Sequence, residues 1–325
     1  MNIPHDSDKD TNPPRPRVSV IIPCYNGERF VGEAIECVLG QSFHALEIVV
    51  VDDGSADGSK AVVQSYAAGE RVTCVEHGKN RGIAAARNTG IKATHAEYVA
   101  FLDQDDLWRV DKLERQLEVL DREDGVGLVF SGHQTSLSGG APRAPRGKAV
   151  PRDINRASKE TVLRTLFLKN YIPMASAVIR RTCFDDLGLL DERIRSGADD
   201  YEFCMRLVSK YRVYHIDEPL LVRRVHGSNF TDDERLAPDG IAINRRLALD
   251  HPELAPLRAR RESELLFKLG RALQRKGKRA GAKKAYRDAV RVRPAYLKAL
   301  LAFALCNLGR FGDGVLNRGN RIRTG

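Results

Sequence analysis

The sequence lacks any uninterrupted apolar run of the roughly 20 residues that a helix needs to span a bilayer. It also lacks an apolar segment near its start that could act as a secretory signal, since residues 1–16 are polar and contain prolines. We therefore expect a flexible leader over residues 1–16 and a cytoplasmic protein without a membrane-spanning helix.

Two groups of functional motifs are also missing. The six cysteines form no CxxC pair and no Cys/His spacing typical of a zinc site, so we interpret them as reduced thiols of the core. Neither the GxGxxG nor the GxxxxGK[ST] phosphate-binding loop occurs. These absences argue against a structural zinc protein, a dinucleotide-dependent oxidoreductase and a P-loop kinase.

The charge that is present is unevenly distributed. The chain has 325 residues and a formal net charge of +10, yet from Asp250 onward 19 Lys and Arg stand against 6 Asp and Glu. Residues 1–249 therefore carry a net charge of −3. A nucleic-acid enzyme would more often surround its cleft with positive charge. We expect no nucleic-acid partner, and a tail that contacts an acidic surface away from the chemistry.

Segments with the pattern of strands and helices alternate along the first third of the chain. Strands are expected at 18–23, 47–51, 72–76 and 98–102, with helices between them at 28–41, 59–68 and 82–93. This order predicts a Rossmann-like, mainly parallel sheet with helices on both faces and a ligand crevice at the carboxyl ends of its strands. We therefore expect the chemistry just after each strand.

The pattern continues less regularly beyond this region. Helices are expected at 109–122, 159–169 and 199–210, and strands at 127–130, 176–179, 212–216 and 220–225. Residues 138–151 are rich in glycine, proline and basic residues, which indicates a mobile loop. This loop is interpreted either as a lid or as a plain flexible connection.

The tail contains a repeat pattern. If Gly270 is the eighth position of a 34-residue helical hairpin, the residues that a tetratricopeptide repeat requires fall at Leu269, Leu273, Ala282, Tyr286, Ala289 and Pro294. Only about one and a half units fit, and such units are stable only when stacked. We expect a catalytic domain over 17–249 and a basic helical region over 250–325 that packs on that domain or on a partner. Its basic surface could contact anionic lipid, bind a protein or simply be solvated.

The segment Phe101-Leu-Asp-Gln-Asp-Asp-Leu-Trp108 places three carboxylates within four positions at the end of a predicted strand. Such crowding is costly unless a cation offsets it. Asp103 and Asp105 can point to the same side, and their oxygens suit Mn²⁺ or Mg²⁺. The alternative is a solvated acidic turn, and Asp106 is expected to cap the next helix.

The end of the strand expected at 47–51 also carries acids. Asp53, in the segment Val49 to Gly58, could accept hydrogen bonds from a nucleobase or a ribose hydroxyl. Asp57 in the same segment is expected to cap the following turn and helix instead. Upstream of the acidic run, Arg87 and Asn88 lie where they could reach the same nucleotide.

A second acidic pair stands at the start of the helix expected at 199–210. Asp199 fits the role of its N-cap, whereas Asp200 is a candidate general base that could take the proton of an attacking hydroxyl. Near the end of the last predicted strand, His226 could complete a metal shell or contact a diphosphate, and Arg224 could neutralise charge there. The alternative for His226 is an exposed surface histidine.

These segments, in this order, resemble the family-two glycosyltransferases of the GT-A fold over residues 18–229. The specific parts are the Val-Asp-Asp-Gly-Ser turn at 51–55, the Asn-Arg-Gly…Ala-Arg-Asn segment at 80–88 and the acidic run. The resemblance implies an inverting, metal-dependent transfer of a sugar from a nucleotide-diphosphate donor, expected to be a UDP-sugar, to a glycan or lipid-linked hydroxyl. It also implies a role in bacterial cell-surface polysaccharide, lipopolysaccharide or glycolipid synthesis, with the enzyme peripheral on the inner face of the membrane.

The resemblance also assigns roles to residues. Asp200 would be the catalytic base, although the family usually has Glu-Asp where this chain has Asp199-Asp200. Asp103 and Asp105 would form a DxD site for Mn²⁺ or Mg²⁺, and His226 would touch the metal or the diphosphate. Contacts to the nucleotide-sugar would come from Pro23, Tyr25, Asn26, Asp53, Arg81, Arg87, Asp103 and Gln104.

Two rival interpretations fit the sequence less well. A degenerate domain that serves only as a scaffold would have lost some of the expected carboxylates, and all of them are present. A sugar-phosphate nucleotidyltransferase would carry a glycine-rich basic loop after its first strand, where this chain has Cys24-Tyr-Asn-Gly27.

Overall fold

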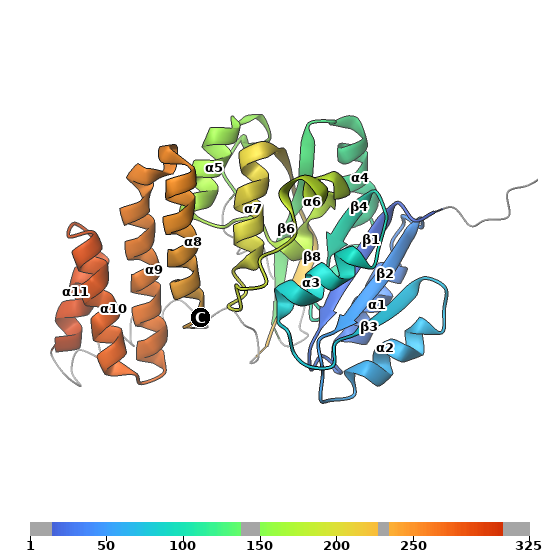
Figure 1. Ribbon diagram of the computed structural model, residues 1–325, viewed down its shortest axis with the longest axis horizontal. Coiled ribbons are helices and arrows are strands. Elements are labelled where there is room, and N and C mark those ends of the chain that lie inside the picture. Colours follow the sequence, from blue (N-terminus) through green and yellow to red (C-terminus); the bar gives the residue numbers. More distant parts are fainter. Residues whose placement is uncertain (1–14, 138–149, 227–233, 308–325) are drawn as a thin grey trace, which may run out of the picture.

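The computed structural model describes residues 15–137, 150–226 and 234–307. Most of the predicted leader and of the loop at 138–151 lies outside these residues. The described strands form one sheet in the order β3-β2-β1-β4-β7-β6-β8-β5 (Figure 1). Their bounds are β1 Val18–Cys24, β2 Leu46–Asp52, β3 Val72–Glu76, β4 Tyr98–Phe101, β5 Leu107–Trp108, β6 Val126–Leu137, β7 Val178–Arg180 and β8 Arg212–Val225.

The sheet is mixed. Strands β3, β2, β1 and β4 are parallel neighbours, which confirms the parallel half predicted from the alternation of strands and helices. Strand β7 runs antiparallel to both β4 and β6, and β5 runs antiparallel to β8, whereas β6 and β8 are parallel. The carboxyl ends of β1, β2 and β4 therefore meet at one edge, as a crevice at that edge requires.

Helices cover both faces of the sheet (Figure 1). Their bounds are α1 Val31–Leu39, α2 Ser59–Ala67, α3 Ile83–Lys92, α4 Lys112–Arg122, α5 Lys159–Leu168, α6 Arg181–Leu187, α7 Asp199–Lys210, α8 Leu236–Asp250, α9 Ala255–Arg275, α10 Arg279–Val292 and α11 Leu297–Asn307. Alternation along β1 explains the two layers: Ile21 belongs to the cluster under α3, α5, α6 and α7, while Val20 and Ile22 belong to the cluster under α1, α2 and α4.

Helix α3 packs close to the sheet at Gly90. A Cβ atom on Gly90 would stand 2.4 Å from Cγ2 of Ile21 in β1, so only glycine fits there. The helix starts after Gly82, whose φ of +95° is a backbone conformation that favours glycine. The tight packing brings the side chains of α3 to the carboxyl ends of the strands.

Several predicted bounds are wrong, for reasons that involve distant partners. The strands expected at 212–216 and 220–225 are one strand, β8, because it pairs with β6 along its length. Its Pro219 is accommodated where the register shifts beside Gly132, since a bulge tolerates the missing N–H. The strand expected at 176–179 starts only at Val178, because Met174–Ser176 form a 3₁₀ turn. The two-residue strand β5 exists through its pairing with β8.

The C-terminal region is helical, as predicted, and packs on the rest of the chain. Tyr286 of α10 lies against Gly270 of α9, where an added Cβ would stand 2.4 Å from Cε1 of the tyrosine ring. Together with Ala282, Ala302 and Cys306, Tyr286 forms a small core of its own. Helix α9 also contacts α8 and α5, so the hairpin is stacked on the part of the chain that precedes it.

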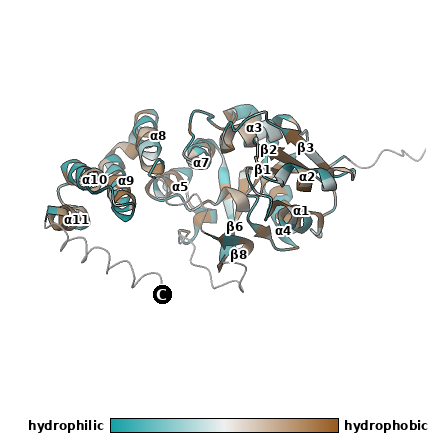
Figure 2. Cartoon of the chain, turned by 90° about the horizontal axis from the view of Figure 1, so that it is seen from below, coloured by the Kyte–Doolittle hydropathy of each residue, from teal (hydrophilic) through white to brown (hydrophobic). Residues whose placement is uncertain are grey.

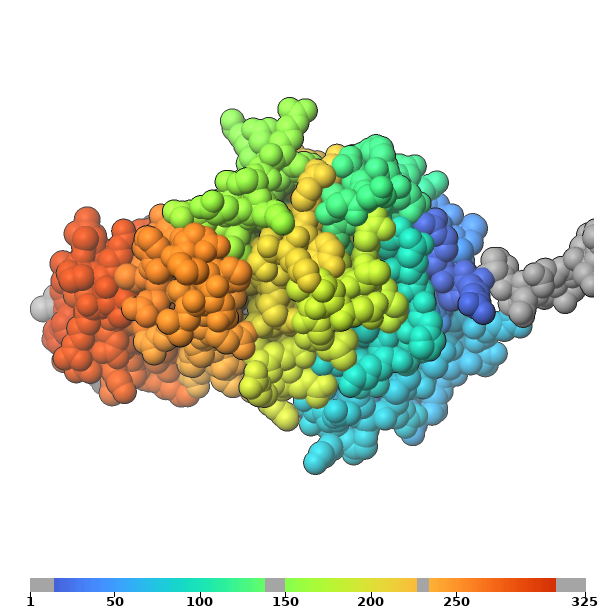
Figure 3. Space-filling model, turned by 45° about the horizontal axis from the view of Figure 1, so that its top comes forward, coloured from blue at the N-terminus to red at the C-terminus, as the bar shows by residue number. Residues whose placement is uncertain are grey.

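The molecule is elongated, with the N-terminal strands at one end and α9, α10 and α11 at the other (Figure 3). Figure 2 shows many hydrophilic residues along the C-terminal helices, while apolar residues gather on the strands. Among the described residues, no helix combines the length and the apolar character that crossing a membrane demands.

Candidate active site

A cavity of about 1650 Å³ opens at the carboxyl ends of β1, β2 and β4 and extends past α7 to α9. The residues predicted from the sequence that line it are Pro23, Tyr25, Asn26, Asp53, Arg87, Asp103, Gln104, Asp105, Asp200 and His226. Arg81 is outside the lining, because its guanidinium turns to Glu192 (Nη2 to Oε2, 3.4 Å). Asn88 and Arg224, which were also expected near the ligand, are outside the lining as well, so the structure brings most but not all of the predicted side chains to one space.

The loops after β1 and β2 are joined by hydrogen bonds. The backbone N–H of Asn26 donates to Oγ of Ser55, and the N–H of Ala56 donates to Oδ1 of Asn26, each at 2.9 Å. Asn26 has a φ of 48°, which asparagine tolerates better than most residues. Asp57 accepts from the N–H of Ser59, the first residue of α2, at 3.0 Å, but Gly58 occupies the N-cap position, so Asp57 holds the turn that leads into the helix and is not its N-cap.

Gln104 is positioned by the backbone of Tyr25. Its Oε1 accepts from the N–H of Tyr25 at 2.8 Å, and its Nε2 donates to the carbonyl of the same residue at 3.2 Å. The two bonds fix the loop after β1 to the acidic run after β4. A Cβ on Gly27 would collide with Gln104, so this approach requires a glycine.

Asp53 accepts hydrogen bonds from the backbone just before α3. Its carboxylate accepts from the backbone N–H groups of Arg81 and Gly82, each at 2.8 Å, and Oδ1 lies 2.6 Å from Nδ1 of His77. His77 in turn contacts Thr89 through Nε2 at 2.9 Å. A carboxylate has about four lone-pair sites, so Asp53 can contact a ligand and still keep these bonds.

The acidic run is crowded. The Asp103 side chain is 37% exposed, toward the cavity, and the protein on its other sides raises its pKa. The negative charge of Asp105 raises this pKa further, whereas the positive charge of Arg87 lowers it. Burial raises the pKa of Asp106 well above its usual value, with Asp103 and Asp105 adding to the shift. This crowding of acids would be relieved by a cation.

The role predicted for Asp106 is wrong. Helix α4 starts only at Lys112, too far along the chain for Asp106 to cap it. Its Oδ1 instead accepts from the backbone N–H of Arg224 at 3.0 Å, and the Arg224 guanidinium donates to the carbonyl of Asp105. Asp106 thus joins the end of β4 to the end of β8.

Arg87 joins the two acidic parts of the cavity. Its Nη2 lies 3.2 Å from Oδ1 of Asp103, and its Nη1 donates to Oδ2 of Asp199 at 2.8 Å. The N-cap predicted for Asp199 is therefore wrong: Ala198 occupies that position, and the buried Asp199 pairs with the buried arginine of α3. Burial of a charge demands such a partner.

His226 lies beside the acidic run. Its Nε2 lies 2.8 Å from Oδ2 of Asp105, and its ring stacks on Phe30 with centroids 4.7 Å apart. Within the described ranges, no group of three or more His, Cys, Asp or Glu is placed to hold a metal ion. Mg²⁺, however, is commonly bound by one or two carboxylates together with substrate phosphates, and Asp103 and Asp105 offer such a pair.

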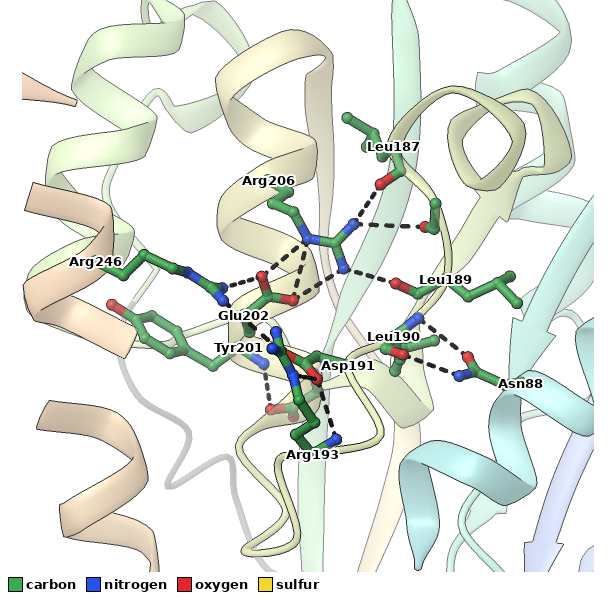
Figure 4. A network of polar contacts seen from close by, with 12 residues as sticks. Asn88, Leu187, Leu189, Leu190, Asp191, Arg193, Tyr201, Glu202, Arg206 and Arg246 are labelled. Atoms are coloured by element: carbon green, nitrogen blue, oxygen red, sulfur yellow. Dashed lines mark hydrogen bonds and ion pairs between the residues drawn. The ribbon is translucent and has the colours of Figure 1, made fainter. Parts of the chain in front are cut away.

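Asp200 lines the cavity at the start of α7, and the segment before it is held by polar contacts (Figure 4). Asn88 of α3 exchanges two hydrogen bonds with the backbone of Leu190, at 2.9 and 3.0 Å. Glu202 of α7 forms ion pairs with Arg206 of the same helix and with Arg246 of α8. Contacts from α3, α7 and α8 thus hold the residues on either side of Asp200.

The far end of the cavity was not predicted from the sequence. Helix α9 contributes Arg261, Lys268, Arg271 and Arg275 to the lining. Their spacing of seven, three and four residues is that of one helix face, a signal that the sequence does contain. What the sequence does not contain is the position of this face next to the cavity.

Comparisons with known proteins agree on one family. A family model described as glycosyl transferase family 2 matches residues 19–188. An uncharacterized glycosyltransferase of Rickettsia typhi is 32% identical over 220 residues, which cover 67% of this chain and 66% of that protein. TuaG of Bacillus subtilis, whose name provisionally assigns it to teichuronic acid biosynthesis, is 40% identical over 129 residues, which cover 39% of this chain and 51% of that protein. The match thus spans somewhat less than two thirds of the Rickettsia protein and about half of TuaG.

Solved structures share the fold. S. aureus TarS 1-349 has a TM-score of 0.60 and 19% identity, and the match covers 91% of this chain and 88% of that chain. TarS is also solved with UDP and with UDP-GlcNAc. The mannosyltransferase PcManGT from Pyrobaculum calidifontis, in complex with GDP-Man and Mn²⁺, has a TM-score of 0.57 and 25% identity, covering 89% of this chain and 79% of that chain. The α/β fold predicted from the sequence, GT-A with helices appended at the C-terminus, is confirmed.

Proposed function

This chain belongs to glycosyl transferase family 2, and we propose on that premise that it transfers a sugar, with inversion, from a nucleotide-diphosphate donor to a hydroxyl acceptor. The observation that carries the proposal is that the acidic run after β4 and Asp200 of α7 line the same cavity. A donor bound at the strand ends would present its sugar between them.

For the donor we propose a UDP-sugar. TarS is solved with UDP-GlcNAc and PcManGT with GDP-Man, so chains of this fold bind nucleotide-diphosphate sugars. In this chain the nucleotide would lie on the joined loops after β1 and β2, against Pro23, Tyr25, Asn26 and Asp53. These loops are joined by hydrogen bonds of the protein itself, and such preorganisation lowers the entropic cost of binding a ligand. Arg87 and Gln104 complete this end of the cavity.

For the cation we propose Mn²⁺ or Mg²⁺ at Asp103 and Asp105, with His226 beside them. The crowded carboxylates favour a hard cation, and PcManGT is solved with Mn²⁺. When bound, the cation would supply Lewis-acid neutralisation of the departing diphosphate. Arg87 keeps the side chain of Asp103 oriented toward this position.

For the catalytic base we propose Asp200. Asp199 is committed to Arg87 inside the protein, so Asp200 is the acid of the pair that lines the cavity. It would accept the proton of the acceptor hydroxyl as this oxygen attacks the anomeric carbon. Attack from the face opposite the diphosphate gives inversion.

We also propose that the product belongs to bacterial cell-surface polysaccharide, lipopolysaccharide or glycolipid synthesis. The support is the similarity to TuaG over part of the chain. A cytoplasmic location and attachment to the inner face of the membrane stay predictions from the sequence.

The proposal is tested with the full chain. UDP-GlcNAc, UDP-glucose and GDP-mannose are each incubated with Mn²⁺, Mg²⁺ or EDTA, and release of nucleoside diphosphate is measured. We expect release from at least one UDP-sugar, loss of it with EDTA and recovery on adding Mn²⁺. Asp103→Ala should show no metal-stimulated release. Full activity of that variant, or equal release with EDTA, would overturn the metal assignment.

A further inference from the structure

The cavity does not end at Asp200 but continues along one face of α9. Four basic side chains of this helix line it, Arg261, Lys268, Arg271 and Arg275, against one acidic side chain, Glu264. From Arg261 to Arg275 the helix rises about 21 Å at 1.5 Å per residue. The acidic strand ends and this basic face therefore mark two electrically opposite ends of one space.

Among these four residues, Arg261 gives the strongest indication of an anionic ligand. Only 8% of its surface is exposed, although it lines the cavity. Its guanidinium carbon lies 5.8 Å from the ring centre of Tyr201, the residue that follows Asp200. Its Nε has no hydrogen-bond partner among the described residues. A buried cation in this state is costly, and an anionic ligand would offset the cost.

Lys268 lies farther along the same face. Its side chain is exposed to the cavity, yet the protein around it and the charges of Arg261 and Lys169 lower its pKa, while Glu264 opposes the shift. An anion beside it would oppose this lowering and pair with its charge. The rings of Phe267 and Tyr296 line the same part of the cavity, and aromatic rings suit the apolar faces of sugars.

We propose that this end of the cavity is the acceptor subsite, and that it selects an anionic glycan, a sugar chain carrying phosphate or carboxylate groups, through Arg261 and Lys268. The assignment of the ligand as acceptor rests on the proposed function. The site is concave and continuous with the position of Asp200, so a chain can enter it, whereas the flat surface of a bilayer cannot.

The test measures binding to the full chain without turnover. The probes are two fluorescent anionic oligomers, a short inorganic polyphosphate and an oligogalacturonate, and the neutral oligosaccharide maltoheptaose. We expect the wild-type protein to bind the anionic probes and not the neutral one. Lys268→Gln and Arg261→Gln should each weaken binding about tenfold, since each removes a charge-assisted contact. Lys268→Gln keeps the test decisive if the buried Arg261 variant does not fold.

Matched controls are Arg258→Gln on α9 and Lys284→Gln on α10, whose exposed side chains are outside the cavity lining. Their binding should equal that of the wild type. Equal weakening by Lys284→Gln would overturn the proposal in favour of diffuse surface charge, and equal binding of maltoheptaose would overturn the preference for anions. Binding to vesicles with phosphatidylglycerol that depends on Lys268, with no oligomer binding, would replace the glycan by a membrane.

The two proposals fail separately. If no donor is turned over but the oligomers bind through Lys268, the transferase function falls and the anionic site stands. If donor turnover is normal and the oligomers do not bind, the acceptor assignment alone falls.

Discussion

At the scale of single residues, Arg87 contributes both to the stability of the fold and to the charge of the site. Its side chain is 4% exposed, and its partner Asp199 is fully buried. The second partner, Asp103, belongs to the acidic run. The same guanidinium therefore stabilises the fold between α3 and α7 and sets the orientation of an acid in the cavity.

Arg87→Gln is expected to lower the free energy of unfolding by about 3–5 kcal/mol, because it leaves Asp199 buried without a cation. Urea denaturation followed by circular dichroism measures this change. The matched control is Arg81→Gln, six residues earlier, whose exposed side chain pairs only at 3.4 Å with Glu192 and should cost less than about 1 kcal/mol. Similar losses from both variants would contradict the role given to Arg87.

Asp200→Asn is expected to leave donor binding within about twofold of the wild type and to lower the rate of transfer by a factor of about 10²–10⁴, the usual contribution of a general base. Titration with UDP in the presence of Mn²⁺ measures the first quantity, and product formation with an accepted sugar chain measures the second. An unchanged transfer rate would remove Asp200 from the role of base.

At the scale of elements, the segment between α6 and α7 owes its position to its charged neighbours. Asp191 accepts two hydrogen bonds from the Arg193 guanidinium, at 2.9 and 2.8 Å, and Arg246 of α8 lies 3.7 Å away. The hydrogen bonds from Arg193 lower the pKa of Asp191 to about 2. Its charged form is thus part of what holds the approach to Asp200 (Figure 4).

This shift predicts a pH dependence of stability. Because the folded-state pKa is depressed, the contribution of Asp191 is complete above its unfolded pKa of about 3.9 and is lost as the pH falls toward 2. Asp191→Asn should therefore lower the free energy of unfolding by roughly 1–2 kcal/mol at pH 7, and the difference from the wild type should vanish between about pH 4 and pH 2. Denaturation at several pH values measures it, with the exposed Asp185→Asn as control. A difference that does not change with pH would reject the charge as its cause.

At the scale of the whole molecule, the core under α7 runs on into the C-terminal helices. Ile243 and Leu247 of α8 and Leu254 before α9 belong to the same apolar cluster as Phe101 of β4. The helical region is therefore not an independent body tied on by a linker, and it should unfold together with the sheet.

Leu254→Ala tests this continuity. The side chain is fully buried, so its truncation should cost about 2–5 kcal/mol, and the whole chain should still unfold in one calorimetric transition at a lower temperature. Leu249→Ala is the control, since that side chain is 79% exposed and should be nearly neutral. Two separate transitions in the variant would show that the helices and the sheet are uncoupled.

The sequence predicted best what depends on neighbours along the chain. The buried runs of β1 to β4 were predicted to within one residue at each end, because each is a short apolar run of strand length bounded by polar turns. Likewise, the acids at strand ends could be expected in one crevice. The roles of Asp199 and Asp106 were missed because their partners, Arg87 and Arg224, are more than 100 residues away in the chain. The single long strand β8 was missed for the same reason, since its length is set by β6.

Because α9 runs along the cavity, the length of a bound chain should affect how long it stays bound. A short chain reaches only the turn that bears Arg261, whereas a longer one also meets Lys268, Arg271 and Arg275. Each further charge that is matched slows dissociation. Residence time should thus grow with chain length, the physical condition for successive additions to one molecule without release. The spacing of the basic residues along α9, which the rise per residue of the helix sets, would then determine which chain lengths stay bound longest.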